Sequence, residues 1–309
     1  MKTALLFPGQ GAQFTGMGSD LFAADPKSSE LLEIADRTLH FHLSELIRNG
    51  PEEELQKTAN TQPGILTVSS AFASYLKRHG LMADMVAGHS LGEYSALVYA
   101  GAITFEDAVR MVHLRGKYMQ EAVPEREGAM AAILGLTSDQ VVTICSRASE
   151  AGVVCAANFN APEQTVISGS ASGVEAAIQL AREEGAKRAV PLKVSAPFHS
   201  PLMELARVRM TAVLNNVSFS RLRMPLVNNI DAMPIQEGEA ARDGLIRQVD
   251  GPVRWVETIR TMANAGVTRY IEVAPGKVLS GLVKRIQSDA EVVSLSTYDE
   301  MTQFLGGTS

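Results

Sequence analysis

Apolar and polar positions along the chain alternate between short strand-like runs and longer helical stretches. Residues 3–7 form a continuous apolar run that ends at a Pro-Gly pair, which is typical of a buried strand followed by a loop. Apolar residues three and four apart predict helices within 31–47 and from Thr61 to Leu76. A short strand, a turn and a helix are then predicted over 84–98. This order indicates helices that cover a sheet.

The order of the predicted strands and helices changes in the middle of the chain, where it is βαββαβ. This order is the split βαβ arrangement of a ferredoxin-like unit. The predicted strands are 129–136, 153–158, 164–168 and 189–194, and the predicted helices are 138–151 and 173–184. We therefore expect a small ferredoxin-like subdomain at 128–196.

Strands alternate with helices on both sides of this insert, so the flanking parts are expected to share one mostly parallel sheet. The fold class predicted from the pattern is α/β with a second, smaller lobe. The large subdomain is expected to comprise 1–127 and 197–309.

Composition narrows the function classes. The 309 residues are 46% hydrophobic and 20% charged, which is a globular balance, and the net charge of −6 disfavours nucleic-acid binding. No run of eighteen apolar residues occurs, so no membrane role is expected and a cytoplasmic protein is the default. Cys145 and Cys155 have no metal-site spacing, and we expect free thiols and no metal.

The first candidate for chemistry is Ser90, in the sequence G-H-S-L-G at 88–92 between the predicted strand and helix. In a G-x-S-x-G nucleophile elbow, the glycines allow strand and helix to approach closely while the serine takes a strained conformation. The helix N-terminus would also stabilise an anion that forms beside the hydroxyl. A structural serine in a tight turn is the alternative until a base is found.

The second candidate is Arg115, on a predicted helix from Phe105 to Gln120. Its apolar positions Phe105, Ala108, Val112 and Met119 form one stripe, and Arg115 occupies the same stripe. Either the side chain extends past the helix end to solvent, or its planar guanidinium lies in a cleft and binds a carboxylate. Spacing alone favours neither interpretation.

A nucleophilic serine needs a base, and the chain has six histidines. Four of them are typical of surface or packing residues: His40, His42, His79 and His113. His89 adjoins Ser90, but neighbours in an extended segment point in opposite directions, so it is better placed to support the turn. His199 lies on a loop where the two predicted lobes rejoin, so it is the candidate base.

Five motifs in order resemble the malonyl-CoA:acyl carrier protein transacylases, almost along the whole chain. They are F-P-G-Q-G-A-Q at 7–13, G-H-S-L-G-E at 88–93, R-G-K at 115–117, N-F-N at 158–160 and A-P-F-H-S at 196–200. The resemblance implies an α/β-hydrolase-like large subdomain with an inserted ferredoxin-like subdomain. That agrees with the fold predicted from the pattern.

The resemblance also implies roles for individual residues. Ser90 would accept the acyl group, His199 would be its base, and Arg115 would bind the malonyl carboxylate. The backbone carbonyl of Gln248 would orient the histidine in place of a triad acid. The oxyanion hole would be formed by the backbone N–H groups of Gln10 and Leu91. Further substrate-binding residues would be Gln10, His89, Asn160 and Phe198, and in related polyketide enzymes a phenylalanine before the histidine accompanies malonyl.

The implied reaction is ping-pong transfer of malonyl from malonyl-CoA to the pantetheine thiol of acyl carrier protein, which supplies type II fatty acid synthesis. No cofactor is expected, and the chain is expected to be a monomer. A stand-alone polyketide acyltransferase shares the chemistry and stays open as an alternative. A serine hydrolase or thioesterase is a second alternative, and a silent scaffold that only docks carrier proteins is a third.

Overall fold

The large part of the protein is built on a mostly parallel six-stranded sheet, in a computed structural model that describes residues 1–124 and 126–307. The strand order is β10-β9-β1-β2-β7-β8, and neighbours pair in parallel except β7 with β8. The strands are β1 (Lys2–Phe7), β2 (Met85–Gly88), β7 (Leu226–Val227), β8 (Pro234–Ile235), β9 (Val267–Val273) and β10 (Glu291–Leu295).

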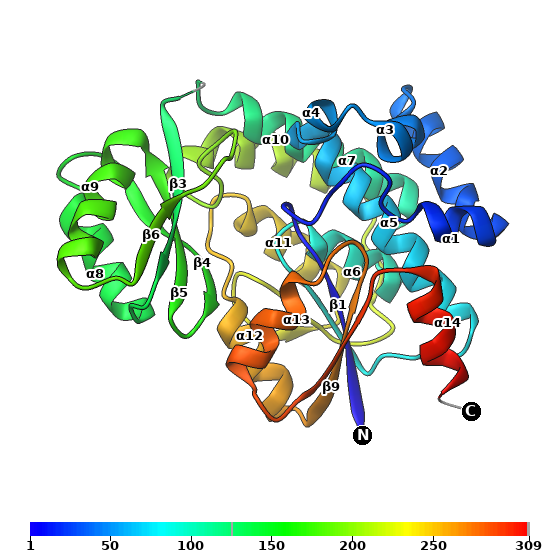
Figure 1. The fold of residues 1–309 in the computed structure, drawn as a ribbon. Helices are drawn as coiled ribbons and strands as arrows, with labels where there is room; N and C mark the ends of the chain where they lie inside the picture. Colours follow the sequence, from blue (N-terminus) through cyan, green and yellow to red (C-terminus); the bar gives the residue numbers. More distant parts are fainter. Residues whose placement is uncertain (125, 308–309) are drawn as a thin grey trace.

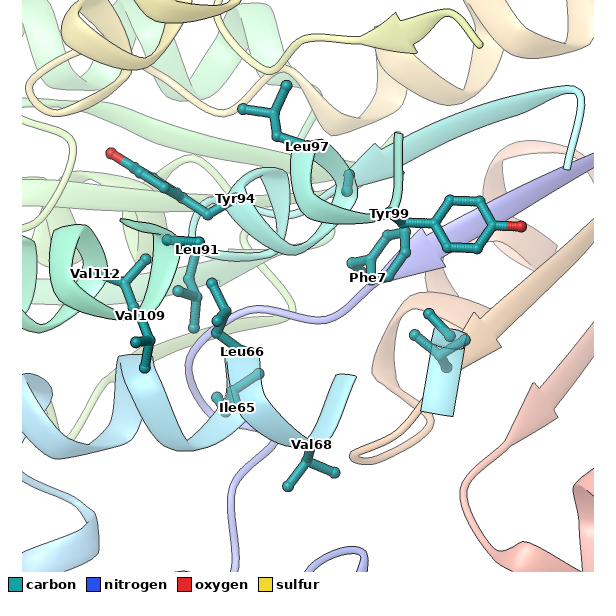
Figure 2. Packing of buried hydrophobic residues seen from close by; sticks show 14 of the residues in the cluster. Phe7, Ile65, Leu66, Val68, Leu91, Tyr94, Leu97, Tyr99, Val109 and Val112 are labelled. Atoms are coloured by element: carbon teal, nitrogen blue, oxygen red, sulfur yellow. The ribbon is translucent and has the colours of Figure 1, made fainter. Parts of the chain in front are cut away.

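Helices cover both faces of this sheet, because the central strands are apolar on both sides. In β1, Leu5 and Phe7 face one core while Ala4 and Leu6 face the other, and all four are fully buried. Figure 2 shows the first core, where the Phe7 ring lies beside the Tyr99 ring. The alternation along one strand therefore separates two helical layers.

The helices of the large part precede and follow the insert. They are α1 (Ser19–Ala24), α2 (Pro26–Leu39), α3 (Leu43–Asn49), α4 (Glu52–Leu55), α5 (Thr58–Arg78), α6 (Gly92–Ala100), α7 (Phe105–Glu121), the 3-10 helix η1 (Pro201–Met203), α10 (Glu204–Asn215), α11 (Gly238–Gln248), α12 (Trp255–Asn264), α13 (Val278–Ile286) and α14 (Tyr298–Gly306). Within the described residues, no helix combines the length and apolar character needed to cross a membrane.

The insert forms a second, antiparallel sheet with two helices, drawn in green in Figure 1. Its elements are β3 (Gly128–Leu134), α8 (Ser138–Ala148), β4 (Val154–Ala161), β5 (Gln164–Ser170), α9 (Ala171–Glu183) and β6 (Arg188–Pro191). The chain order βαββαβ and the sheet order β4-β5-β3-β6 confirm the predicted ferredoxin-like unit. The proposed limits of the two subdomains, 1–127 with 197–309 and 128–196, stay predictions.

The two sheets are connected by backbone hydrogen bonds as well as by the covalent chain. Val253 donates its N–H to the Ala157 carbonyl at 2.8 Å, and Phe159 donates to the Val253 carbonyl at 2.9 Å. This short parallel bridge attaches β4 to the segment between α11 and α12. It fixes the insert over the carboxyl end of the main sheet, where ligands bind in open α/β folds.

Several predicted element ends differ from the observed ones by two or three residues, among them the ends of β3, β4, α8 and β6. The start of α5 is also wrong: this helix begins at Thr58, three residues before the expected start, and Pro63 lies inside it. A proline lacks the N–H that would bond to the carbonyl four residues earlier, here that of Ala59. His113 on α7 bonds to that carbonyl through Nδ1 at 2.8 Å. A contact from a distant helix therefore compensates for the proline, and no local pattern contains it.

Gly116 on α7 allows the close packing of α7 against α5 and gives a first testable prediction. A Cβ at this position would lie 2.5 Å from the Thr58 carbonyl oxygen, so Gly116→Ala forces the two helices apart. We expect the free energy of unfolding to fall by about 1–3 kcal/mol in chemical denaturation.

Gly281→Ala on α13 is the matched control, because its Cβ would meet nothing within 4 Å. In a helix this change is expected to be neutral or to stabilise by about 0.5–1 kcal/mol. Equal destabilisation by both substitutions would contradict the packing argument.

Candidate active site

Ser90 lies on the sharp turn between β2 and α6, as the G-x-S-x-G pattern predicts. Its φ of 52° is in the left-handed region, where residues other than glycine are strained. A Cβ on Gly88 would lie 1.9 Å from the carbonyl carbon of Gly92, and a Cβ on Gly92 would lie 2.1 Å from the carbonyl oxygen of Phe7. Glycine is therefore required at both positions.

His199 lies within hydrogen-bond distance of the serine. Its Nε2 is 2.7 Å from Ser90 Oγ, although the two residues are 109 positions apart in the chain. Its Nδ1 is 3.0 Å from the carbonyl oxygens of both Gln248 and Gly251. Because carbonyl oxygens only accept, the proton must be on Nδ1, and Nε2 is free to accept the serine proton.

The surroundings keep this histidine neutral. Burial lowers the pKa of His199 to about 3, and the positive charge of Arg115 and the neighbouring His89 act in the same direction. The imidazole is therefore unprotonated at neutral pH, as a general base must be. Two carbonyls orient it, and no carboxylate takes part in this orientation among the described residues.

Arg115 is fully buried at 1% exposure, so the interpretation in which it reaches solvent is wrong. Its Nη1 donates to Gln62 Oε1, and its Nη2 donates to Gln248 Oε1 and Ser90 Oγ, each at 3.0 Å. Its Nε has no partner, and none of the ion pairs in the described part of the chain involves it. A buried guanidinium without a directly bound carboxylate could hold the carboxylate of a ligand.

These groups open into one cavity of about 200 Å³ between the two sheets. The large part contributes the elbow, the arginine and the histidine, and the insert contributes apolar side chains and two asparagines. The lining residues are Gln10, Gln62, His89, Ser90, Leu91, Arg115, Met119, Met130, Asn158, Asn160, Val166, Leu192, Val194, Phe198 and His199. Every predicted site residue except Gln248 is in this lining.

The backbone N–H groups of Leu91, which adjoins Ser90, and of Gln10, in the same cavity lining, are the predicted donors to an oxyanion. Leu91 precedes the first turn of α6, and Gln10 lies in the loop after β1. No acceptor in the described part of the chain bonds to either N–H. Since Leu91 is fully buried, its amide is an unpaired donor beside the nucleophile.

His89 supports the turn, and its side chain points across the cavity to the insert. Its Nε2 lies 2.8 Å from Asn160 Oδ1 on β4, and its ring lies 5.5 Å from the Trp255 ring. Burial lowers the pKa of His89, so it is neutral as well. Phe198 precedes the base and lies in the cavity wall at 9% exposure.

Sequence reasoning missed four groups that contact this site: Gln62, Glu93, Asn229 and Gly251. Glu93 belongs to the G-H-S-L-G-E motif, but the motif implied no role for it. Asn229 follows β7 at the carboxyl end of the main sheet, which is a position that often carries site residues. Gln62 was predicted only as part of a helix start, and the Gly251 carbonyl has no signal in sequence.

Metal-ligating side chains do not gather at this site. Among the described residues, no group of three or more His, Cys, Asp or Glu side chains is arranged to hold a metal ion. Both cysteines are free thiols, with Cys145 buried and Cys155 half-buried.

A strained serine, an oriented neutral histidine and a free amide beside the serine form an arrangement that can accept an acyl group. The chain matches the family described as "Acyl transferase domain" over residues 4–300, which places it in the acyl transferase class.

Individual relatives narrow this class. The malonyl CoA-acyl carrier protein transacylase of Bacillus subtilis is 48% identical over 96% of this chain and 93% of its own length. That of Haemophilus influenzae is 45% identical over 98% of this chain and 99% of its own. The solved transacylase from Coxiella burnetii superposes with a TM-score of 0.96 at 40% identity. The match covers 99% of this chain and 97% of the Coxiella chain.

A solved complex of a type II PKS acyl-carrier protein with its malonyl-transacylase gives a TM-score of 0.97 at 42% identity. It covers 99% of this chain and all of the matched chain. The chain belongs to the malonyl-CoA:acyl carrier protein transacylase family.

Burial of His199 predicts a specific dependence of stability on pH. Its pKa is about 3 in the folded protein, against 6.5 for an ordinary histidine, so between these values the unfolded chain binds more protons. The contribution of His199 to the free energy of unfolding is fully present above pH 6.5 and is lost as pH falls towards 3. We expect the difference in the free energy of unfolding between wild type and His199→Gln to shrink by about 1.4 kcal/mol for each pH unit as pH falls through this window.

Urea denaturation at a series of pH values measures this difference. His42→Gln is the control, because the His42 side chain is 89% exposed. A constant difference between wild type and His199→Gln across the window would contradict a neutral, buried His199.

Proposed function

We propose that this protein moves the malonyl group from malonyl-CoA to the phosphopantetheine thiol of acyl carrier protein through a malonyl-serine intermediate. The observation that carries the proposal is the fully buried Arg115, whose Nη2 lies 3.0 Å from Ser90 Oγ. A carboxylate bound there would lie one short acyl chain from the nucleophile. The 40–48% identity to transacylases of this name supports the same substrate.

In the first half-reaction, Ser90 Oγ attacks the thioester carbonyl and its proton passes to His199 Nε2. The oxyanion would be held by the N–H groups of Leu91 and Gln10. The tetrahedral intermediate then breaks its C–S bond, and coenzyme A leaves as a thiol with the proton from His199. Arg115 donates to Ser90 Oγ, so an arriving carboxylate would take over this donor and leave the serine to His199.

The second half-reaction reverses these steps with a different thiol. The phosphopantetheine thiol gives its proton to His199 and attacks the malonyl-serine ester. Collapse of the intermediate breaks the ester bond and returns the proton to Ser90 Oγ. Gln248 and Gly251 keep the imidazole in one orientation throughout, so the same nitrogen serves as base and acid.

The proposed selectivity for malonyl depends on the positive charge of Arg115 and on the Phe198 side chain in the cavity wall. An acetyl group would supply no carboxylate to bond directly to the buried Arg115, which disfavours that substrate. Phe198 in the cavity wall is proposed to restrict the space for a branched acyl chain, so that malonyl fits better than methylmalonyl. His89 and Asn160 are proposed to contact substrate from the cavity wall, with no cofactor required.

The direct test is incubation of the protein with malonyl-CoA followed by intact-mass measurement and addition of holo acyl carrier protein. We expect a malonyl adduct that disappears as malonyl-carrier protein forms. Release of the adduct to water faster than to the carrier would indicate a thioesterase instead. A panel of fatty acid and polyketide carrier proteins tests our assignment to fatty acid synthesis, and size-exclusion chromatography tests the proposed monomer.

A further inference from the structure

Glu93 is a buried carboxylate behind the nucleophile, and the proposed reaction steps do not use it. It lies in the first turn of α6 at 1% exposure. Its Oε2 accepts the Asn229 backbone N–H and the Gln248 Nε2–H, both at 2.9 Å. Its Oε1 has no hydrogen-bond partner among the described residues. Such a group needs a reason to be buried beside an active site.

The Gln248 side chain connects Glu93 to Arg115. Its Nε2 donates to Glu93 and to the Ser90 carbonyl oxygen, the latter at 3.1 Å. Both of these groups can only accept, so the amide nitrogen must face them and Oε1 must face Arg115, which donates to it at 3.0 Å. One neutral amide therefore separates a buried anion from a buried cation that are not directly paired.

Asn229 links the same network to the strained turn. Its Oδ1 accepts the Ser90 N–H at 2.6 Å, and its Nδ2 donates to the Gly88 carbonyl at 2.7 Å. The backbone N–H and C=O of Ser90 are thus both held, by Asn229 and Gln248. Glu93 bonds to both of these residues, so its charge state acts on the nucleophile and on Arg115 together.

Binding of a substrate carboxylate changes the charge balance of this network. In the empty site, one buried anion compensates one buried cation through the amide. A malonyl carboxylate on Arg115 would add a second anion to the same dry region, which is unfavourable unless one of them is neutralised. We propose that Glu93 is a positioning residue that balances the charge of Arg115 in the empty site and takes up a proton when the substrate carboxylate binds. This inference rests on the proposed function.

The titration behaviour of the surrounding groups supports this proposal. Burial raises the pKa of Glu93 to about 7, against the lowering effects of the Asn229 and Gln248 hydrogen bonds and of Arg115. A proton on Oε1 leaves both hydrogen bonds to Oε2 intact. A nearby anion would raise this pKa further, so proton uptake is expected near neutral pH.

Other titratable groups face Glu93 or the cavity, and they do not account for uptake near neutral pH. Burial raises the pKa of Tyr94 to about 12 and lowers that of His199 to about 3. Burial also lowers the pKa of His89, the other histidine in the cavity lining. Asp231 has a lowered pKa because Arg247 binds it by two hydrogen bonds, of 2.7 and 2.5 Å. Proton uptake near pH 7 would therefore report on Glu93.

The experiment is calorimetric titration of the Ser90→Ala variant with malonyl-CoA in buffers of different ionisation enthalpy, at pH 7 to 8. We expect uptake of a fraction of a proton for each malonyl-CoA bound, and none with acetyl-CoA, which lacks only the carboxylate. Adding Glu93→Gln should abolish the uptake, because the amide keeps an acceptor but loses the charge. At pH 8 the double variant should bind malonyl-CoA roughly 5-fold or more tightly.

Glu272→Gln in the same background is the matched control. Glu272 is also a fully buried glutamate, but it accepts the N–H groups of Leu279 and Ser280 at the start of α13. We expect it to change stability without changing proton uptake. Malonyl-CoA binding without uptake, or uptake that persists in Glu93→Gln, would overturn this inference alone. Failure to bind malonyl-CoA at all would overturn the proposed function with it.

Discussion

Replacing Ser90 with alanine is expected to abolish the malonyl adduct and to lower kcat for malonyl transfer by roughly 10⁴-fold. The reason is that Ser90 Oγ is the atom that would carry the acyl group, and His199 Nε2 lies 2.7 Å from it with a free lone pair. Intact-mass measurement after incubation with malonyl-CoA detects the adduct, and a coupled transfer assay gives kcat.

Ser95→Ala provides the matched control for this substitution. Ser95 lies on the same helix, is also fully buried, and its hydroxyl has no hydrogen-bond partner among the described residues. The Ser95→Ala variant is expected to form the malonyl adduct and to have a kcat for malonyl transfer equal to those of wild type. A Ser90→Ala protein that still gains the malonyl mass would refute the nucleophile assignment.

Replacing Arg115 with methionine is expected to lower kcat/KM for malonyl-CoA by roughly 10²-fold or more, because loss of one partner of a buried charge pair costs about 3 kcal/mol. Acetyl-CoA makes no ion pair with the guanidinium, so kcat/KM for acetyl-CoA should hold or rise. Comparison of the two substrates measures this reversal of preference. Arg115→Lys should also lower kcat/KM for malonyl-CoA, since an ammonium cannot bond to Gln62 and Gln248 in the same fork geometry.

Arg110→Met is the control on the same helix. Arg110 pairs at the surface with Asp107, and its side chain is 57% exposed. Its kcat/KM for both substrates is expected to stay at the wild-type value. Equal losses with malonyl-CoA and acetyl-CoA in Arg115→Met would mean that Arg115 only supports the fold.

The spacing of apolar, polar and glycine residues was sufficient to predict the elements that lie within one stretch of the chain. The apolar run of β1, the elbow around Ser90 and the order of elements in the insert are all predictable without knowledge of any long-range contact. Each depends on residues that are neighbours in sequence, through side-chain alternation, helical spacing and glycine sterics. The fold class followed for the same reason.

Other features depend on contacts between distant segments. The helix around Pro63 starts earlier than expected, and His113 on α7 bonds to the carbonyl that the proline leaves free. Helix α14 was missed, although Thr297 and Glu300 form a capping box that the sequence T-Y-D-E displays. The contact that compensates for Pro63 is visible only in the tertiary structure, whereas the signal for α14 was present in the sequence.

For the candidate site, the sequence by itself supplied residue types: a serine on a turn, a loop histidine and an arginine on an apolar stripe. Only the tertiary structure decided that Arg115 faces the serine, that Gly251 shares the orientation of His199 with Gln248, and that Glu93 reaches Arg115 through one amide. The physical reason is that burial and hydrogen bonding are set by groups far apart in the chain, and these determine the charge of each group and the atom it faces.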